Sequence, residues 1–160
     1  MALNDEAVWQ ALERVMDPEI PTLSVVDLGM IQELRVDGVT AHVAITPTFL
    51  GCPALDMIQD AIRDQIGQAG AQVVTVELRL EPVWTSNRIT PDGQRKLKAF
   101  GLAPPLPHTG EFNIRLLDNV PCPWCDSTDT HLESMFGATL CRAIYYCQAC
   151  RQSFEQFKPV

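Results

Sequence analysis

Four cysteines in the last quarter of this sequence constrain its fold more than any other feature. They form two C-x-x-C pairs, Cys122/Cys125 and Cys147/Cys150, with 21 residues between the pairs. Two intervening residues let both thiolates of a pair turn toward one ion, and two such pairs complete a tetrahedron of sulfurs. We therefore predict a closed four-cysteine metal site with structural zinc, while iron stays open because it takes the same sulfur ligands.

The segment that holds these cysteines, residues 112–160, is predicted to be a small β-rich zinc ribbon. It contains little apolar sequence, and a domain of this size usually needs a disulfide, a metal ion or oligomerisation to stay folded. Zinc binding, on the order of 10 kcal/mol, would supply that folding energy. Cys141 fits neither pair, so we expect a small buried side chain there, with an exchangeable metal ligand as the alternative. His108 and His131 lack ligand spacing and are expected at the surface.

The preceding part, residues 1–100, shows alternating helix and strand patterns that predict an α+β domain. The predicted order is α-β-β-α-β-α, with one sheet covered by helices. An Asp37-Gly38 turn between two period-two segments indicates a hairpin. Three prolines in four positions, Pro104 to Pro107, favour a linker over 101–111. The predicted helices span about 5–16, 53–68 and 91–100, and the predicted strands span 31–36, 39–45 and 73–80.

The charge and the cysteine content limit the classes of function. The formal net charge is −8, which argues against binding to nucleic acid because that binding depends on neutralising phosphates. No apolar run approaches the ~18 residues of a membrane span, and Met1 to Glu6 show no export leader. We therefore expect a cytoplasmic protein, in which cysteines are metal ligands or reactive thiols before they are disulfides.

Cys52 stands apart from the ribbon cysteines. Pro53 suits the first position of a helix, which would make Cys52 the N-cap and lower its pKa through the free backbone N–H groups. The carboxylates of Asp17 and Glu19 are expected to approach it, with Thr48 as a hydroxyl ligand or hydrogen-bond donor. Two plainer interpretations stay open: an apolar N-cap cysteine, and acidic residues that only form a turn.

Several separated motifs resemble known families. The segments 17–21, 26–29, 46–53 and 82–84 are similar to the SufT-like family, whose members assist iron–sulfur cluster assembly or delivery. The segments 84–86 and 90–105, together with the ribbon up to Lys158, resemble the PaaD family. Members of the PaaD family are the D subunits (also called J) encoded with ring-epoxidising phenylacetyl-CoA oxygenases. Asn87-Arg88 departs from that pattern, where an acidic and then an aromatic residue are expected.

The resemblance implies an accessory protein with no catalytic site of its own. Oxygen insertion would belong to a di-iron subunit, and electrons would come through an iron–sulfur flavin reductase. Cys52, with Asp17, Glu19 and Thr48, would transiently hold iron or an iron–sulfur cluster for an oxygenase component, foremost that reductase. One such cysteine per chain favours a homodimer or a cluster shared with the client. The alternative is a structural or regulatory subunit that bridges the multicomponent oxygenase.

Overall fold

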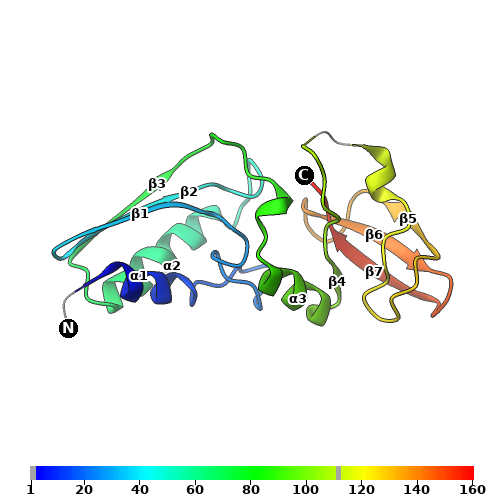
Figure 1. Ribbon diagram of the computed structural model, residues 1–160, viewed down its shortest axis with the longest axis horizontal. Coiled ribbons are helices and arrows are strands. Elements are labelled where there is room, and N and C mark those ends of the chain that lie inside the picture. The colour runs from blue at the N-terminus through cyan, green and yellow to red at the C-terminus, as the bar shows by residue number, and fades with distance from the viewer. Residues whose placement is uncertain (1–2, 111–112) are drawn as a thin grey trace. The chain divides into compact units, whose positions relative to one another are not determined.

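The computed structural model describes residues 3–110 and 113–160, which form two compact units. The first unit ends at Trp84 and the second begins at Thr85. Figure 1 shows helices and strands in both, as the α+β prediction requires. None of the helices in the described ranges is long and apolar enough to cross a membrane. The division into a domain over 1–100, a linker over 101–111 and a ribbon over 112–160 stays a prediction.

The first unit is built on a three-stranded sheet in the order β1-β2-β3. Strands β1 and β2 are antiparallel and joined at Gly38, whose φ of +58° suits glycine in a tight turn. Strand β3 runs parallel to β2, and helix α2 makes the crossover between them. The strands span Ile31–Asp37 (β1), Thr40–Ile45 (β2) and Val73–Leu78 (β3).

Helices α1 and α2 lie on one face of this sheet (Figure 1). In α1 (Asp5–Leu12), the Asn4 side chain accepts a 2.8 Å hydrogen bond from the Ala7 N–H, as an N-cap does. Helix α1 ends at Leu12 and not near Met16, because Met16 instead pairs with Ser24 in an isolated bridge. In α2 (Leu55–Gln68) the buried residues recur every fourth position, at Ile58, Ile62 and Ile66.

Trp84 packs at the end of the first unit and is buried there. Its Nε1–H donates a 2.7 Å hydrogen bond to the Leu28 backbone oxygen, 56 residues earlier in the chain. This bond ties the segment after β3 to the loop before β1. The loop that carries Cys52 is attached to the same loop before β1 by a separate bond, from the Thr46 N–H to the Met30 backbone oxygen at 2.8 Å.

The second unit contains a four-stranded sheet in the order β4-β7-β6-β5. Strands β5, β6 and β7 form an antiparallel meander, and β4 adds to β7 in parallel. Residues of the predicted linker therefore pair with the ribbon at β4, just before the first proline. The strands span Leu102–Ala103 (β4), Thr130–Ser134 (β5), Arg142–Cys147 (β6) and Gln152–Phe157 (β7).

Three helical segments complete the second unit: α3 (Pro91–Phe100) and the short 3₁₀ helices η1 (Ser86–Arg88) and η2 (Ile114–Leu117). Helix α3 is capped by Thr90 and ends at Gly101, whose φ is +93°. His108, expected at the surface, is instead half-buried. Its Nε2 lies 2.7 Å from the Val160 backbone oxygen and 3.2 Å from the Ser86 hydroxyl oxygen.

Candidate metal centre and thiol site

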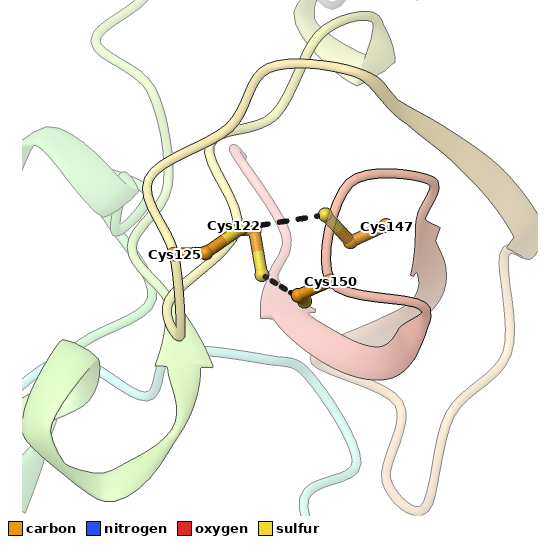
Figure 2. Close-up of side chains that lie close together, drawn as sticks. All are labelled: Cys122, Cys125, Cys147 and Cys150. Atoms are coloured by element: carbon orange, nitrogen blue, oxygen red, sulfur yellow. Dashed lines mark hydrogen bonds between the residues drawn. The ribbon is translucent and has the colours of Figure 1, made fainter.

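The four ribbon cysteines converge on one point, as the spacing predicts. Each contributes a sulfur, and all four sulfurs lie within 4.8 Å of one another. Figure 2 shows Cys122 and Cys125 on one loop and Cys147 and Cys150 on the β6–β7 turn. The sulfurs of Cys122 and Cys150 are 3.7 Å apart, and those of Cys125 and Cys147 are 3.6 Å apart. Sulfurs bound tetrahedrally at about 2.3 Å from zinc would lie about 3.8 Å from one another, so the donor set fits zinc.

Both C-x-x-C turns use the same backbone device. The residue after the second cysteine adopts a left-handed conformation in each turn, with φ of +61° at Asp126 and +58° at Arg151. In the first turn the Cys122 N–H donates to the Ser127 backbone oxygen, and the Asp126 N–H donates to the Cys122 oxygen, both at 2.9 Å. These bonds fold the backbone around the two sulfurs, so each pair is shaped locally by its own turn.

The rest of the ribbon core supports the cysteines. Cys122 and Cys147 are fully buried in a cluster with Tyr145 and Phe154, whose rings stack with centroids 5.5 Å apart. The Tyr145 hydroxyl donates a 3.1 Å hydrogen bond to the Leu117 backbone oxygen. The cluster also contains Ala103, Val120 and Ala143. Loss of the ion would therefore disturb the core as well as the metal site.

The thiols of the second turn differ in acidity. A backbone hydrogen bond from Cys150, together with neighbouring thiols, lowers the pKa of Cys147 to about 7. Burial and the neighbouring thiols raise the pKa of Cys150 to about 12. Four thiolates therefore cannot coexist near neutral pH unless a cation compensates their charge. All four positions are protein ligands with no place for substrate, which is the arrangement of a structural zinc site.

Cys141 lies outside this centre and is buried immediately before β6. Its sulfur is 3.0 Å from the Thr139 hydroxyl oxygen, and its backbone oxygen accepts from the Lys158 N–H at 2.9 Å. This placement agrees with the small buried side chain that we expected.

Cys52 is half-buried in the loop between β2 and α2. The prediction that it is the N-cap is wrong, because the helix begins at Leu55 and Ala54 takes the cap position. The Leu55 N–H bonds the Cys52 backbone oxygen at 3.2 Å, which makes a turn that precedes the helix. Pro53 therefore lies in this turn and not at the first helical position.

The prediction that the Cys52 pKa falls is also wrong. The backbone N–H groups of Ala54 and Leu55 do bond the sulfur and favour the thiolate, as expected of a helix start. Burial outweighs them, and the charges of Glu19 and Asp17 act in the same direction, so the pKa of Cys52 is raised. Sequence spacing alone could not show this, because the burial of the sulfur and the approach of the two carboxylates both come from the tertiary fold.

The structure thus brings Asp17 and Glu19 into the electrostatic environment of Cys52. Asp17 also shapes its own turn, since its carboxylate accepts from the N–H groups of Glu19 and Ile20 at 2.8 and 2.9 Å. Thr48 is half-buried four residues before Cys52, in the same loop. The acidic residues are therefore both turn formers and neighbours of the thiol.

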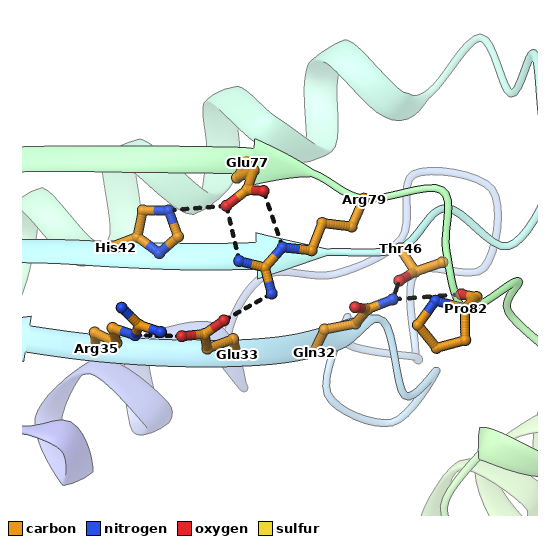
Figure 3. Close-up of polar contacts among 8 residues, drawn as sticks. All are labelled: Gln32, Glu33, Arg35, His42, Thr46, Glu77, Arg79 and Pro82. Carbon is orange, nitrogen blue, oxygen red and sulfur yellow. Dashed lines mark hydrogen bonds and ion pairs between the residues drawn. The ribbon is translucent and has the colours of Figure 1, made fainter.

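A polar network on the open face of the first sheet was not predicted (Figure 3). The Arg79 guanidinium bonds Glu77 at 2.9 and 3.0 Å and Glu33 at 2.6 Å, while Arg35 pairs with Glu33 and His42 with Glu77. The hydrogen bonds from Arg79 lower the pKa of both glutamates. The repeated Glu-Leu-Arg sequence at 33–35 and 77–79 is the signal that was available, because period-two charges mark one face of a strand.

Comparison with known protein families divides the chain in the same way as its two kinds of site. Residues 5–78 match the family described as iron–sulfur cluster assembly protein, and residues 108–158 match the PaaD zinc beta ribbon domain. Cys52 lies in the first matched segment, and all four metal-site cysteines lie in the second.

Two curated relatives extend this result. The D component of the "Putative 1,2-phenylacetyl-CoA epoxidase" of Escherichia coli (strain K12) is 40% identical over 151 residues, covering 94% of this chain and 90% of the relative. The "Fe-S protein maturation auxiliary factor YitW" of Bacillus subtilis (strain 168) is 30% identical over 89 residues, covering 53% of this chain and 84% of the relative.

Solved structures agree on the fold of the first unit. A domain of unknown function, DUF59, from Bacillus anthracis aligns with a TM-score of 0.54 at 23% identity, covering 58% of this chain and 90% of that one. A conserved hypothetical protein from Thermotoga maritima aligns with a TM-score of 0.52 at 33% identity, covering 59% and 94%. Because the identity with the Escherichia coli D component extends over almost the full length of both chains, this chain belongs to the PaaD family and joins an iron–sulfur cluster assembly domain to a zinc β-ribbon.

Proposed function

We propose that this chain is an accessory protein of a phenylacetyl-CoA ring-epoxidising oxygenase system in phenylacetate degradation, and that it assists iron–sulfur cluster assembly or delivery. It has no catalytic site of its own in this proposal, and it works in the cytoplasm, where thiols stay reduced. The names of the two curated relatives support the two halves of this role, one for the oxygenase and one for iron–sulfur maturation.

The observation that carries the proposal is the environment of Cys52. Its sulfur is half-buried, receives backbone N–H groups from Ala54 and Leu55, and lies in the field of Asp17 and Glu19. One thiolate with carboxylate neighbours is a weak set of ligands for iron, because clusters are normally held by four cysteines. Such a set suits cargo that must leave again. Thr48 would add a hydroxyl group at the edge of the site.

Delivery by this thiol is a ligand exchange without a change of oxidation state. A thiol of the client loses its proton and bonds the iron of the cargo, and the bond between that iron and the Cys52 sulfur breaks. The released Cys52 thiolate takes up a proton, so atoms and charge balance. Since the first unit offers one cysteine, the cargo completes its ligands from a second copy of the chain or from the client.

The client in this proposal is the iron–sulfur flavin reductase of the oxygenase, because it is the component that the PaaD resemblance implies to carry a cluster. The test is to produce this reductase in cells that also make the wild-type chain, Cys52→Ala or Cys141→Ala. We expect Cys52→Ala to lower the iron and acid-labile sulfide of the purified reductase. Cys141→Ala removes a thiol that lies outside both sites, and it should leave the cluster content unchanged. A reductase with full cluster content beside Cys52→Ala would refute delivery.

A second candidate function is a structural subunit that bridges oxygenase components. It is favoured by exposed apolar side chains on the loop between β5 and β6, where Phe136 is 74% and Leu140 is 59% exposed. The Lys158 ammonium group contacts both residues. It lies 5.3 Å from the centre of the Phe136 ring and donates a 2.9 Å hydrogen bond to the Leu140 backbone oxygen. This function predicts stable co-elution with the oxygenase that Phe136→Ser weakens and Cys52→Ala does not change.

A further inference from the structure

Exposed apolar side chains flank the Cys52 thiol on both sides in the sequence. Leu50 is 75% exposed and Met57 is 61% exposed, whereas the neighbouring Ala54 and Ile58 are buried. Leu50 precedes the thiol in its loop, and Met57 lies in the first turn of α2. Single exposed apolar residues are ordinary, but two large ones beside a half-buried thiol expose apolar surface at a candidate transfer site.

A second loop adds to the same end of the sheet. The loop after β3 exposes Leu80 by 51% and Val83 by 75%. It lies beside the loop after β2, because the Arg79 N–H donates to the Ile45 oxygen at 2.8 Å. The Gln32 side chain bonds both loops, at Thr46 and at the Pro82 oxygen (Figure 3). We use the name apolar rim for Leu50, Met57, Leu80 and Val83.

Negative charge lies near the Cys52 side of this apolar rim. Asp17 and Glu19 act on the thiol itself, and Asp56 is exposed in the first turn of α2. The first unit as a whole contains four Arg and Lys residues against thirteen Asp and Glu residues. Two copies that met at this end would therefore bring like charges together, which costs association energy at low ionic strength.

We propose that the apolar rim is the docking surface for the client protein, whose complementary face presents apolar and basic side chains beside its cluster cysteines. This inference rests on the proposed function, because ligand exchange requires the client thiol to come within bonding distance of the iron held by Cys52. A half-buried sulfur can be reached in this way only if the client covers the residues that flank it. Leu50 and Met57 are the exposed apolar residues that flank the thiol in the sequence, and Leu80 and Val83 extend the apolar surface on the neighbouring loop. The acidic residues near the thiol select a basic partner over a second acidic copy.

The test compares Leu50→Glu and Val83→Glu with a matched control, Val39→Glu. Val39 is 45% exposed in the turn between β1 and β2, at the opposite end of the sheet, so the control adds the same charge to the same unit away from the thiol. Each variant is loaded anaerobically with iron and sulfide, and cluster transfer to the apo-reductase is measured over a range of reductase concentrations.

We expect each rim variant to raise the half-saturating reductase concentration about tenfold, the effect of losing one central interface contact. The iron and sulfide content before transfer should stay unchanged, and Val39→Glu should behave as wild type. High ionic strength should weaken docking of the wild-type chain to the reductase. Unchanged half-saturation in the rim variants, or an equal loss in Val39→Glu, would overturn the docking surface.

Two further outcomes separate this inference from the proposal on which it rests. If Cys52→Ala transfers cluster as well as wild type, the proposed function fails, whatever the rim variants do. If Cys52→Ala abolishes transfer while the rim variants dock normally, only the docking surface fails. Sedimentation gives the remaining outcome: a wild-type dimer that Leu50→Glu dissociates would overturn the client as the occupant, since a second copy would then cover the rim.

Discussion

Replacing Gly101 with alanine tests how helix α3 is fitted to the metal ribbon. Gly101 ends α3 with a φ of +93°, and a Cβ placed there would lie 2.4 Å from Cη2 and 2.8 Å from Cζ2 of Trp124. Trp124 lies inside the first C-x-x-C pair, and the pair is joined to α3 a second time by the ion pair between Lys98 and Asp126. The added methyl group of the variant therefore clashes with a side chain of a metal-binding turn.

Two costs add up in Gly101→Ala. A left-handed backbone costs a non-glycine residue about 1–2 kcal/mol, and overpacking costs about 1–3 kcal/mol. Because Trp124 is 54% exposed, its ring can move away and relieve part of the contact. We expect the free energy of unfolding of the second unit to fall by about 2–3 kcal/mol. Gly110→Ala is the control, because its φ is +96° and no atom lies within 4 Å of the added Cβ, so only the backbone cost of about 1–2 kcal/mol applies.

The assay is equilibrium denaturation of the zinc-loaded protein, with zinc release to a metallochromic indicator marking the unfolding of the second unit. Gly101→Ala is also made together with Trp124→Ala, where it should cost no more than Gly110→Ala. Equal losses for Gly101→Ala and Gly110→Ala, or the same loss with and without the Trp124 ring, would refute the packing argument.

Three other perturbations have defined outcomes. A zinc chelator should abolish the cooperative unfolding of the second unit while the NMR signals of the first unit persist; an ordered ribbon without metal would contradict this. Trp84→Phe should lower the urea midpoint of the first unit by an amount equivalent to about 1–2 kcal/mol, because the buried Leu28 oxygen loses its donor. Arg79→Met should destabilise the protein at neutral pH. The depressed pKa values of Glu33 and Glu77 give stability that is present at neutral pH and lost as pH falls through them, so wild type and variant should converge in acid; a gap that stays constant with pH would exclude this linkage.

The features that could be predicted from the sequence are those that a few neighbouring residues determine. The two C-x-x-C turns are local structures, closed by left-handed residues at Asp126 and Arg151, so their spacing was enough to predict a four-sulfur site. The Asp37-Gly38 turn predicted the β1–β2 hairpin for the same reason. The helix predicted over 53–68 is local in the same sense, because Ile58, Ile62 and Ile66 recur at helical spacing and are all buried.

The features that were missed depend on residues far apart in the chain. The acidity of Cys52 is set by burial and by carboxylates more than thirty residues earlier, which outweigh the local N–H groups. The Arg79 network joins strands β1 and β3, which are not adjacent in the sheet. β4 could not be foreseen because two residues carry no periodicity, and only their pairing with β7 makes them a strand.

The proposed function depends most on Cys52 holding cargo that the ribbon does not hold. The direct measurement is a count of zinc, iron and acid-labile sulfide per chain in protein purified without oxygen, with wild type beside Cys52→Ala. We predict about one zinc per chain in both proteins, as a closed four-thiolate site binds. Iron and sulfide should be present in the wild type and absent from the variant. Zinc alone in the wild type, or equal iron and sulfide in both proteins, would contradict the proposed function.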